Sequence, residues 1–99
     1  MIASVMEITE FALRPGCSED VFMNTAGDVN AAASKLRGFK SRRLLKSNSG
    51  WIEIFEWEDM ASATAAAEIW SSLPGLETYC SMVDHNSMKF GCHPIMAKA

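Results

Sequence analysis

The sequence of 99 residues has few cysteines and no long apolar run. Its three cysteines, Cys17, Cys80 and Cys92, form no C-x-x-C pair, so we interpret them as thiols in a reducing compartment and not as a disulfide framework. Uncharged runs such as Met60 to Ala67 are far shorter than the ~20 residues that span a bilayer. The amino terminus also lacks a basic segment followed by an apolar stretch. We therefore expect no membrane association and a cytoplasmic location.

The sequence is also poor in positive charge. Nine Lys and Arg residues stand against 12 Asp and Glu, a formal charge of −3, and no dense basic run is present. Nucleic acid is therefore not an expected partner, because the phosphate backbone is bound by clustered cations. What the sequence does contain is apolar: 48% of its residues are hydrophobic and 21% are charged, which is typical of a globular chain. Since domains commonly have ~150 residues, we expect a single domain over residues 1–99.

Four segments have the composition of β-strands. They are Ser4–Leu13, Phe39–Lys46, Trp51–Trp57 and Ser87–Cys92, all rich in β-branched, aromatic or long apolar residues. The second and third are joined by Ser47-Asn48-Ser49-Gly50, which is typical of a hairpin turn. A three-residue loop with Gly50 in the left-handed conformation would place Arg42 opposite Glu56 and Leu44 opposite Ile54; a two-residue loop would change these pairs.

The segments between the strands have helical spacing. Ser18 is a candidate N-cap, and Phe22, Ala26, Val29, Ala33 and Leu36 recur at intervals of four and three, ahead of a helix end at Gly38. A second helix is expected after the N-cap Asp59, with Met60, Ala63, Ala67 and Trp70 on one face. Leu73-Pro74-Gly75 ends it, and a shorter helix follows from about Leu76 to Val83.

The order β-α-β-β-α-β predicts an α+β protein with the ferredoxin-like fold, in which both helices cover one face of a four-stranded antiparallel sheet. Both alternating sets of residues in the first and third strands are mostly apolar. A monomer would then expose several aromatic side chains in one patch on the uncovered face. We therefore expect a homodimer, sheet against sheet about a twofold axis, that buries on the order of 2,000 Å² or more.

Three phrases carry a resemblance to a known family: GFKSRRLLK, WIEIFEWEDMASA and LPGLETYCSMV. In these phrases and in its element order the chain resembles the dimeric α+β barrel group that includes antibiotic-biosynthesis-monooxygenase-like domains. The resemblance implies a cavity between the sheet and the two helices of each subunit. It also implies that Trp70 lines this cavity, as a tryptophan of the second helix does in several members.

The family's other chemical residues are not matched. Ala66 stands where the family often has His or Asn, and Cys80 stands where haem-degrading members have a histidine. The first strand has no Asn, which those members carry there. These departures argue against haem degradation, and they leave the polar substrate anchors of the cofactor-independent monooxygenases without counterparts. We expect no cofactor.

His85 and Glu53 are the candidate proton-transfer residues. A histidine at the corner between the last helix and the last strand could act as an acid or base at the cavity rim. The alternative is a solvated turn, since Asp84-His85-Asn86 is turn-like. Glu53 shares its strand face with Trp51, Phe55 and Trp57, and a carboxyl group in such surroundings could abstract a proton. The alternative is ion pairing across strands, for which Arg42 and Arg43 are available.

Trp70 and Tyr79 are the candidate ligand-binding residues. Tyr79 shares a helix face with Leu76 and Val83, so its hydroxyl could offer a hydrogen bond inside the pocket, or its ring could simply fill the core. No metal is expected, although Cys80, His85, Cys92 and His93 lie within fourteen residues. Their spacing lacks both a C-x2-4-C and an H-x3-5-H clamp.

Together these observations predict a homodimer with a small apolar cavity. Its chemistry would be cofactor-independent monooxygenation, or proton transfer of the isomerase type, on a small aromatic or polyketide-like molecule. Trp70 would stack on the molecule, Tyr79 would donate a hydrogen bond, and His85 or Glu53 would move the proton. The alternative is a dimer that binds a small ligand, or responds to stress, without catalysis.

Overall fold

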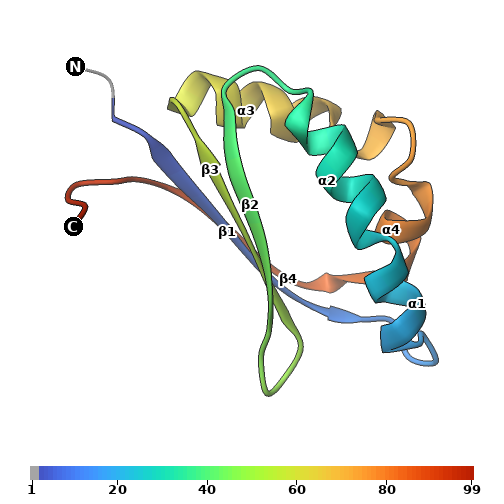
Figure 1. The fold of residues 1–99 in the computed structure, drawn as a ribbon. Helices are drawn as coiled ribbons and strands as arrows, with labels where there is room; N and C mark the ends of the chain where they lie inside the picture. Colours follow the sequence, from blue (N-terminus) through green and yellow to red (C-terminus); the bar gives the residue numbers. More distant parts are fainter. Residues whose placement is uncertain (1–2) are drawn as a thin grey trace.

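A four-stranded antiparallel sheet forms one layer of the protein, and the helices form the other (Figure 1). The computed structural model describes residues 3–99. The strands occur in the spatial order β2-β3-β1-β4. In sequence order the elements are β1 (Val5–Leu13), α1 (Glu19–Asn24), α2 (Ala26–Ser34), β2 (Phe39–Lys46), β3 (Trp51–Trp57), α3 (Met60–Ile69), a 3-10 turn (Trp70–Ser72), α4 (Glu77–Met82) and β4 (Val83–Pro94). The predicted ferredoxin-like α+β fold is confirmed. Within the described residues, no helix is long and apolar enough to cross a membrane.

The helix boundaries follow the predicted capping residues. Ser18 Oγ accepts a hydrogen bond from the Val21 N–H at 3.4 Å, and Asp59 Oδ1 accepts one from the Ser62 N–H at 2.8 Å. Gly38 has a φ of +81°, and a Cβ at this position would overlap the Ser62 side chain. Glycine is therefore required here both by the backbone conformation and by the close approach of α3.

The first predicted helix is divided into α1 and α2. At the junction, the Thr25 hydroxyl donates a hydrogen bond to the Phe22 carbonyl at 2.6 Å, and the Thr25 N–H donates to the same carbonyl at 3.0 Å. These bonds tighten the turn, because they use an i→i−3 partner in place of the α-helical i→i−4 partner. The apolar face nevertheless continues across the junction, since Phe22, Val29 and Ala33 are all fully buried.

The register predicted for the hairpin on the condition of a left-handed Gly50 is wrong. Arg42 lies opposite Phe55, and Leu44 lies opposite Glu53. Residues 47–50 form the loop, and the Ser47 N–H donates a hydrogen bond to the Gly50 carbonyl at 2.9 Å. Gly50 does not have a positive φ. It is instead needed for space, because a Cβ there would overlap the Phe11 carbonyl oxygen of β1.

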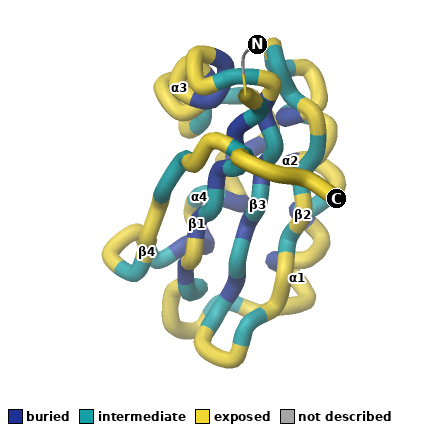
Figure 2. Tube along the Cα trace, turned by 90° about the vertical axis from the view of Figure 1, so that its left-hand side faces the viewer, coloured by how far each residue is buried: buried dark blue, intermediate teal, exposed yellow. Residues whose placement is uncertain are grey.

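The expectation that aromatic side chains cover the open face of the sheet is also wrong. Trp51, Phe55 and Trp57 point toward the helices and are 6%, 1% and 1% exposed. The register explains why: alternate residues of β3 share a face with Phe11 and its neighbours on β1, and the helices pack on that face. The open face, which Figure 2 views from the front, carries aliphatic side chains of intermediate burial on its central strands. They are Met6, Ile8, Ile52 and Ile54.

The last strand is longer than predicted and is interrupted. β4 pairs regularly with β1 from Val5↔Pro94 to Glu10↔Lys89, and the pairing resumes at Ala12↔Asp84. Residues 85–88 therefore form a wide bulge opposite the single residue Phe11. Ser87 holds the bulge, because its hydroxyl accepts a hydrogen bond from the Ala12 N–H at 2.9 Å and donates one to the Asp84 carbonyl at 2.6 Å. The turn-like character of residues 84–86 is thus accommodated inside a strand.

Candidate functional site

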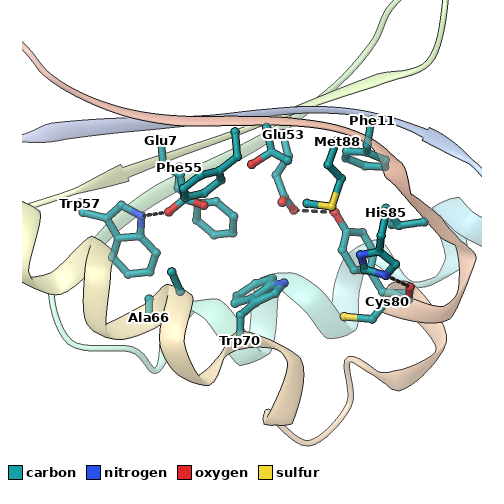
Figure 3. A pocket seen from close by; sticks show the side chains of 15 residues that line it. Glu7, Phe11, Glu53, Phe55, Trp57, Ala66, Trp70, Cys80, His85 and Met88 are labelled. Atoms are coloured by element: carbon teal, nitrogen blue, oxygen red, sulfur yellow. Dashed lines mark hydrogen bonds between the residues drawn. The ribbon is translucent and has the colours of Figure 1, made fainter.

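A cavity of about 180 Å³ lies between the sheet and the helices. Side chains of β1 and β3 form its sheet side, while α3, Trp70 and α4 form the opposite side (Figure 3). The cavity separates two clusters of buried apolar side chains, one around Phe22 and Tyr79 and the other around Phe55 and Trp57. Trp70 packs against both clusters, and its ring lies edge-on to Phe55 with 5.3 Å between centroids. The predicted location of Trp70 in such a cavity agrees with this geometry.

Glu7 is a buried carboxyl group at the sheet side of the cavity. It is 9% exposed, and its Oε1 accepts a hydrogen bond from Trp57 Nε1–H at 3.0 Å. Burial raises the pKa of Glu7 from 4.5 to about 7; the Trp57 hydrogen bond opposes this rise and the nearby charge of Glu53 adds to it. Cys92 lies opposite Glu7 on β4, and burial together with the charge of Glu7 raises the pKa of its thiol. Glu7 can therefore change its protonation state near neutral pH.

Glu53 lies next to Glu7 on the same face of the sheet but has different partners. Its Oε2 accepts two hydrogen bonds from Arg42, from Nε at 2.9 Å and from Nη2 at 2.7 Å, and a third from the Tyr79 hydroxyl at 2.8 Å. Arg42 also donates from Nη1 to Asn30 Oδ1 at 2.9 Å. The side chains of Arg42 and Glu53 are only 3% and 7% exposed, so this is a buried ion pair. The predicted alternative of ion pairing across strands is therefore correct for Glu53.

Tyr79 is 4% exposed and reaches the cavity from α4. Burial, followed by the charge of Glu53, raises the pKa of its phenol above the ordinary value, so the hydroxyl keeps its proton. Since that proton is donated to Glu53, the hydroxyl offers an acceptor to the cavity and not the donor that the sequence suggested.

His85 and Met88 lie at the mouth of the cavity, because the bulge of β4 carries them there. Figure 3 shows the His85 ring beside Cys80. The exposed His85 ring forms a hydrogen bond between Nε2 and the Cys80 carbonyl at 3.1 Å. In the tautomer in which Nε2 donates this bond, Nδ1 is an acceptor.

The four residues weighed as metal ligands do not converge. Among residues 3–99, no group of three His, Cys, Asp or Glu side chains is arranged to hold a metal ion. Cys80 lines the cavity from α4, and Cys92 packs against the buried cluster around Phe55. His93 follows on the other face of β4, where it packs over Gly91.

The structure brings all four predicted site residues to one cavity: Trp70, Tyr79, Glu53 and His85. It adds one residue that the sequence interpretation did not select. Nothing local in the sequence distinguishes Glu7 from Glu10, the other glutamate in the middle of the first strand. The signal that separates them is the register, which pairs Glu7 with Phe55 and places it under the helices, while Glu10 stays exposed on the other face.

Comparison with known proteins supports the resemblance at the level of the fold. The sequence matches no protein-family model and no curated protein sequence. Among solved structures, the chain is similar to SnoaB, a cofactor-independent oxygenase from Streptomyces nogalater, with a TM-score of 0.76 and 15% identity over 97% of this chain and 96% of that one. A candidate antibiotic biosynthesis monooxygenase from Nitrosomonas europaea matches with a TM-score of 0.73 and 11% identity, over 97% and 93% of the two chains.

A third structure, a candidate antibiotic biosynthesis monooxygenase from Bordetella bronchiseptica, matches with a TM-score of 0.70 and 14% identity over 96% of this chain and 99% of that one. All three likenesses extend over nearly the whole of both chains. The chain therefore has the ferredoxin-like fold of the antibiotic-biosynthesis-monooxygenase-like proteins, the group that its sequence resembles.

Proposed function

We propose that the protein is a cofactor-independent monooxygenase that acts on a small aromatic or polyketide-like molecule, and that Glu7 is the base that starts the reaction. The observation that carries the proposal is the buried carboxyl group of Glu7 at an apolar cavity, with a pKa raised by burial to about 7. A general base works best when its pKa lies near the working pH. The fold shared with a cofactor-independent oxygenase supports the choice of reaction.

The residues around Glu7 suit proton removal from an activated carbon. Trp57 holds Oε1, which makes Trp57 a positioning residue and leaves Oε2 to accept the proton of a bound molecule. Trp70 and Phe55 offer aromatic faces and edges for a planar substrate. The size also fits, since a cavity of about 150 Å³ accepts benzene and this one, at about 180 Å³, is open at its mouth.

The reaction balances with molecular oxygen alone. Glu7 removes a proton from a methylene group that lies between a carbonyl and an aromatic ring, and the resulting enolate is electron-rich enough to react with O₂ directly. The methylene carbon becomes a carbonyl carbon, one oxygen atom is retained there, and the other leaves as water. His85 is the proposed proton relay between the cavity mouth and solvent, and the Arg42–Glu53–Tyr79 network keeps the sheet side of the cavity rigid.

The test uses 2-tetralone, an uncharged two-ring ketone with an acidic methylene. Exchange of that methylene in D₂O reports proton removal, and O₂ uptake with product mass spectrometry reports oxygenation. Glu7→Gln should slow exchange by roughly 10²- to 10³-fold, while Glu10→Gln, an exposed carboxylate on the other face of the same strand, should not. His85→Gln identifies the relay: a loss as large as that of Glu7→Gln would make His85 the base.

The combined readouts separate the candidate functions. Exchange with O₂ uptake supports the monooxygenase. Exchange without O₂ uptake assigns isomerase-type proton transfer instead. Binding with neither assigns the alternative of a ligand-binding protein without catalysis.

We also propose that the open face of the sheet is covered by a second copy of the chain. Ile8 and Ile54 lie directly opposite each other at its centre, flanked by Ile52 and Met6. A twofold axis would bring this patch against itself. Light scattering should therefore give twice the chain mass of 10.9 kDa, and Ile54→Lys should shift it toward the single-chain mass. A single-chain mass for the unsubstituted protein in dilute solution would reject the dimer.

A further inference from the structure

Among residues 3–99, the cavity is lined by carboxyl groups and by no lysine or arginine. Fifteen described residues line it, and the acidic ones among them are Glu7 and Glu53. No lysine or arginine is among these fifteen. Arg42 reaches Glu53 from β2, but its guanidinium group is already engaged by Glu53 and Asn30. No cation of the described lining is thus available to pair with an anionic ligand inside the cavity.

The two carboxylates are not equally compensated. Glu53 has Arg42 at 2.7 Å, whereas the partner of Glu7 is the neutral indole N–H of Trp57. The other titratable groups that face Glu7 are Glu53 on its own sheet and the Cys92 thiol on β4. Neither supplies positive charge. A third negative charge beside Glu7 would be repelled across an apolar space, where such interactions are stronger than in water.

The carboxyl groups also lie on one side of the cavity. Figure 3 shows Glu7 and Glu53 pointing down from the strands. The Tyr79 hydroxyl reaches across from α4 and donates a hydrogen bond to Glu53. Trp70 and Ala66 form the opposite, helix side. The carboxylate oxygens accept hydrogen bonds, and so does the Tyr79 oxygen once its proton is given to Glu53. A bound molecule is therefore held more tightly when it supplies a hydrogen-bond donor along the edge that faces the sheet.

We propose that the cavity selects uncharged aromatic molecules that carry a hydroxyl or amino group on one edge, and that it excludes aromatic carboxylates. This inference deepens the proposed function by naming the class of substrate. It concerns binding alone, so its test measures affinity, whereas the test of the proposed function measures exchange and O₂ uptake. Selective binding without turnover would leave this proposal standing and reject the enzyme.

The experiment compares three probes that share one ring system: 2-naphthol, 2-methoxynaphthalene and 2-naphthoate. At pH 8 the naphthol is uncharged, the naphthoate is ionised and Glu7 is mostly ionised. Affinities are measured by titration calorimetry, with quenching of tryptophan fluorescence as a second readout. We expect 2-naphthol to bind at least roughly tenfold more tightly than 2-naphthoate, with the methoxy compound between them because it lacks the donor.

Two variants identify the source of the selection. Glu7→Gln removes the charge and keeps the size, so 2-naphthoate should bind roughly tenfold more tightly than to the unsubstituted protein, and the preference for 2-naphthol should shrink. Glu10→Gln removes one negative charge from the exposed face of the same strand and should leave the ratio unchanged.

Several results would overturn the proposal. They are failure of 2-naphthol to bind, equal binding of 2-naphthol and 2-naphthoate, and an equal gain in naphthoate affinity from Glu10→Gln. The comparison of the three probes on the unsubstituted protein does not depend on the folding of any variant, so it decides the proposal by itself.

Discussion

The raised pKa of Glu7 predicts that this residue lowers the stability of the folded protein above neutral pH. The ordinary pKa of a glutamate is 4.5, the value expected in the unfolded chain, and the folded value is about 7. Below pH 4.5 both states carry the proton and the group has no net effect. Between pH 4.5 and 7 the folded state holds more protons than the unfolded state, so stability falls as the pH rises through this window. Above pH 7 the full cost is present.

The size of this cost follows from the two pKa values. Each tenfold change in proton affinity corresponds to about 1.4 kcal/mol, so a rise from 4.5 to about 7 corresponds to roughly 3 kcal/mol. Because the cavity opens to solvent at its mouth, we expect about 2–3 kcal/mol at pH 8. Glu7→Gln should abolish the cost, since glutamine retains an acceptor for Trp57 Nε1–H and carries no charge.

Urea unfolding of both proteins from pH 4.5 to 8.5 measures the effect. The two unfolding free energies should be similar at pH 4.5 and should diverge until Glu7→Gln is the more stable protein at pH 8. Taking the difference cancels other titrating groups such as Glu56, whose pKa is lowered by Lys98 and Lys40 in both proteins. A variant that is less stable than the unsubstituted protein at pH 8, or a difference that does not depend on pH, would refute the reasoning.

Three further predictions concern the same cavity. Arg42→Met should lower the unfolding free energy by about 3–5 kcal/mol, because it leaves the buried carboxylate of Glu53 without its partner. Lys35→Met, at an exposed position after α2, should change it by less than ~0.5 kcal/mol, and urea unfolding at neutral pH measures both. Trp70→Ala should weaken the binding of 2-naphthol. It should also lower the unfolding free energy by about 3–5 kcal/mol, because the ring packs against two buried clusters. Unchanged binding in a folded variant would make Trp70 a core residue only. If Glu7 is the base, kcat/KM for exchange should rise with pH to a plateau above an apparent pKa near 7, and a rate that falls with pH over that range would exclude it.

Much of the fold was predictable because its signals are local. The N-caps Ser18 and Asp59 depend on residues within one turn of themselves, as does the left-handed conformation of Gly38, and each lies where the sequence indicates. The division of the first helix was not predictable from its apolar spacing. Thr25 changes the hydrogen-bond partner without changing which residues are buried, so the pattern reads as one helix.

The site was predictable in its location but not in its chemistry. Trp70 and Tyr79 could be placed because the resemblance and the helical spacing both pointed to the cavity. The difference between Glu7 and Glu53 depends on which side chain Arg42 reaches, and this follows from the hairpin register. The turn of this hairpin packs against β1, where a Cβ at Gly50 would overlap the Phe11 carbonyl oxygen, a contact between segments far apart in the sequence. The residues around Gly50 in the sequence do not predict this contact.

The bulge of β4 lets the mouth of the cavity vary independently of its interior. The sheet side of the cavity, with Glu7 and Glu53, consists of paired strands. An insertion of one residue there would turn the side chains that follow it to the other face of the sheet. The residues over the opening lie in a stretch outside the regular ladder, and the ladder resumes on both sides of it. Additions or deletions between Asp84 and Lys89 can therefore alter which molecules are admitted while the reacting groups stay where they are. Proteins of this fold can therefore differ at the mouth of the cavity while its interior stays the same.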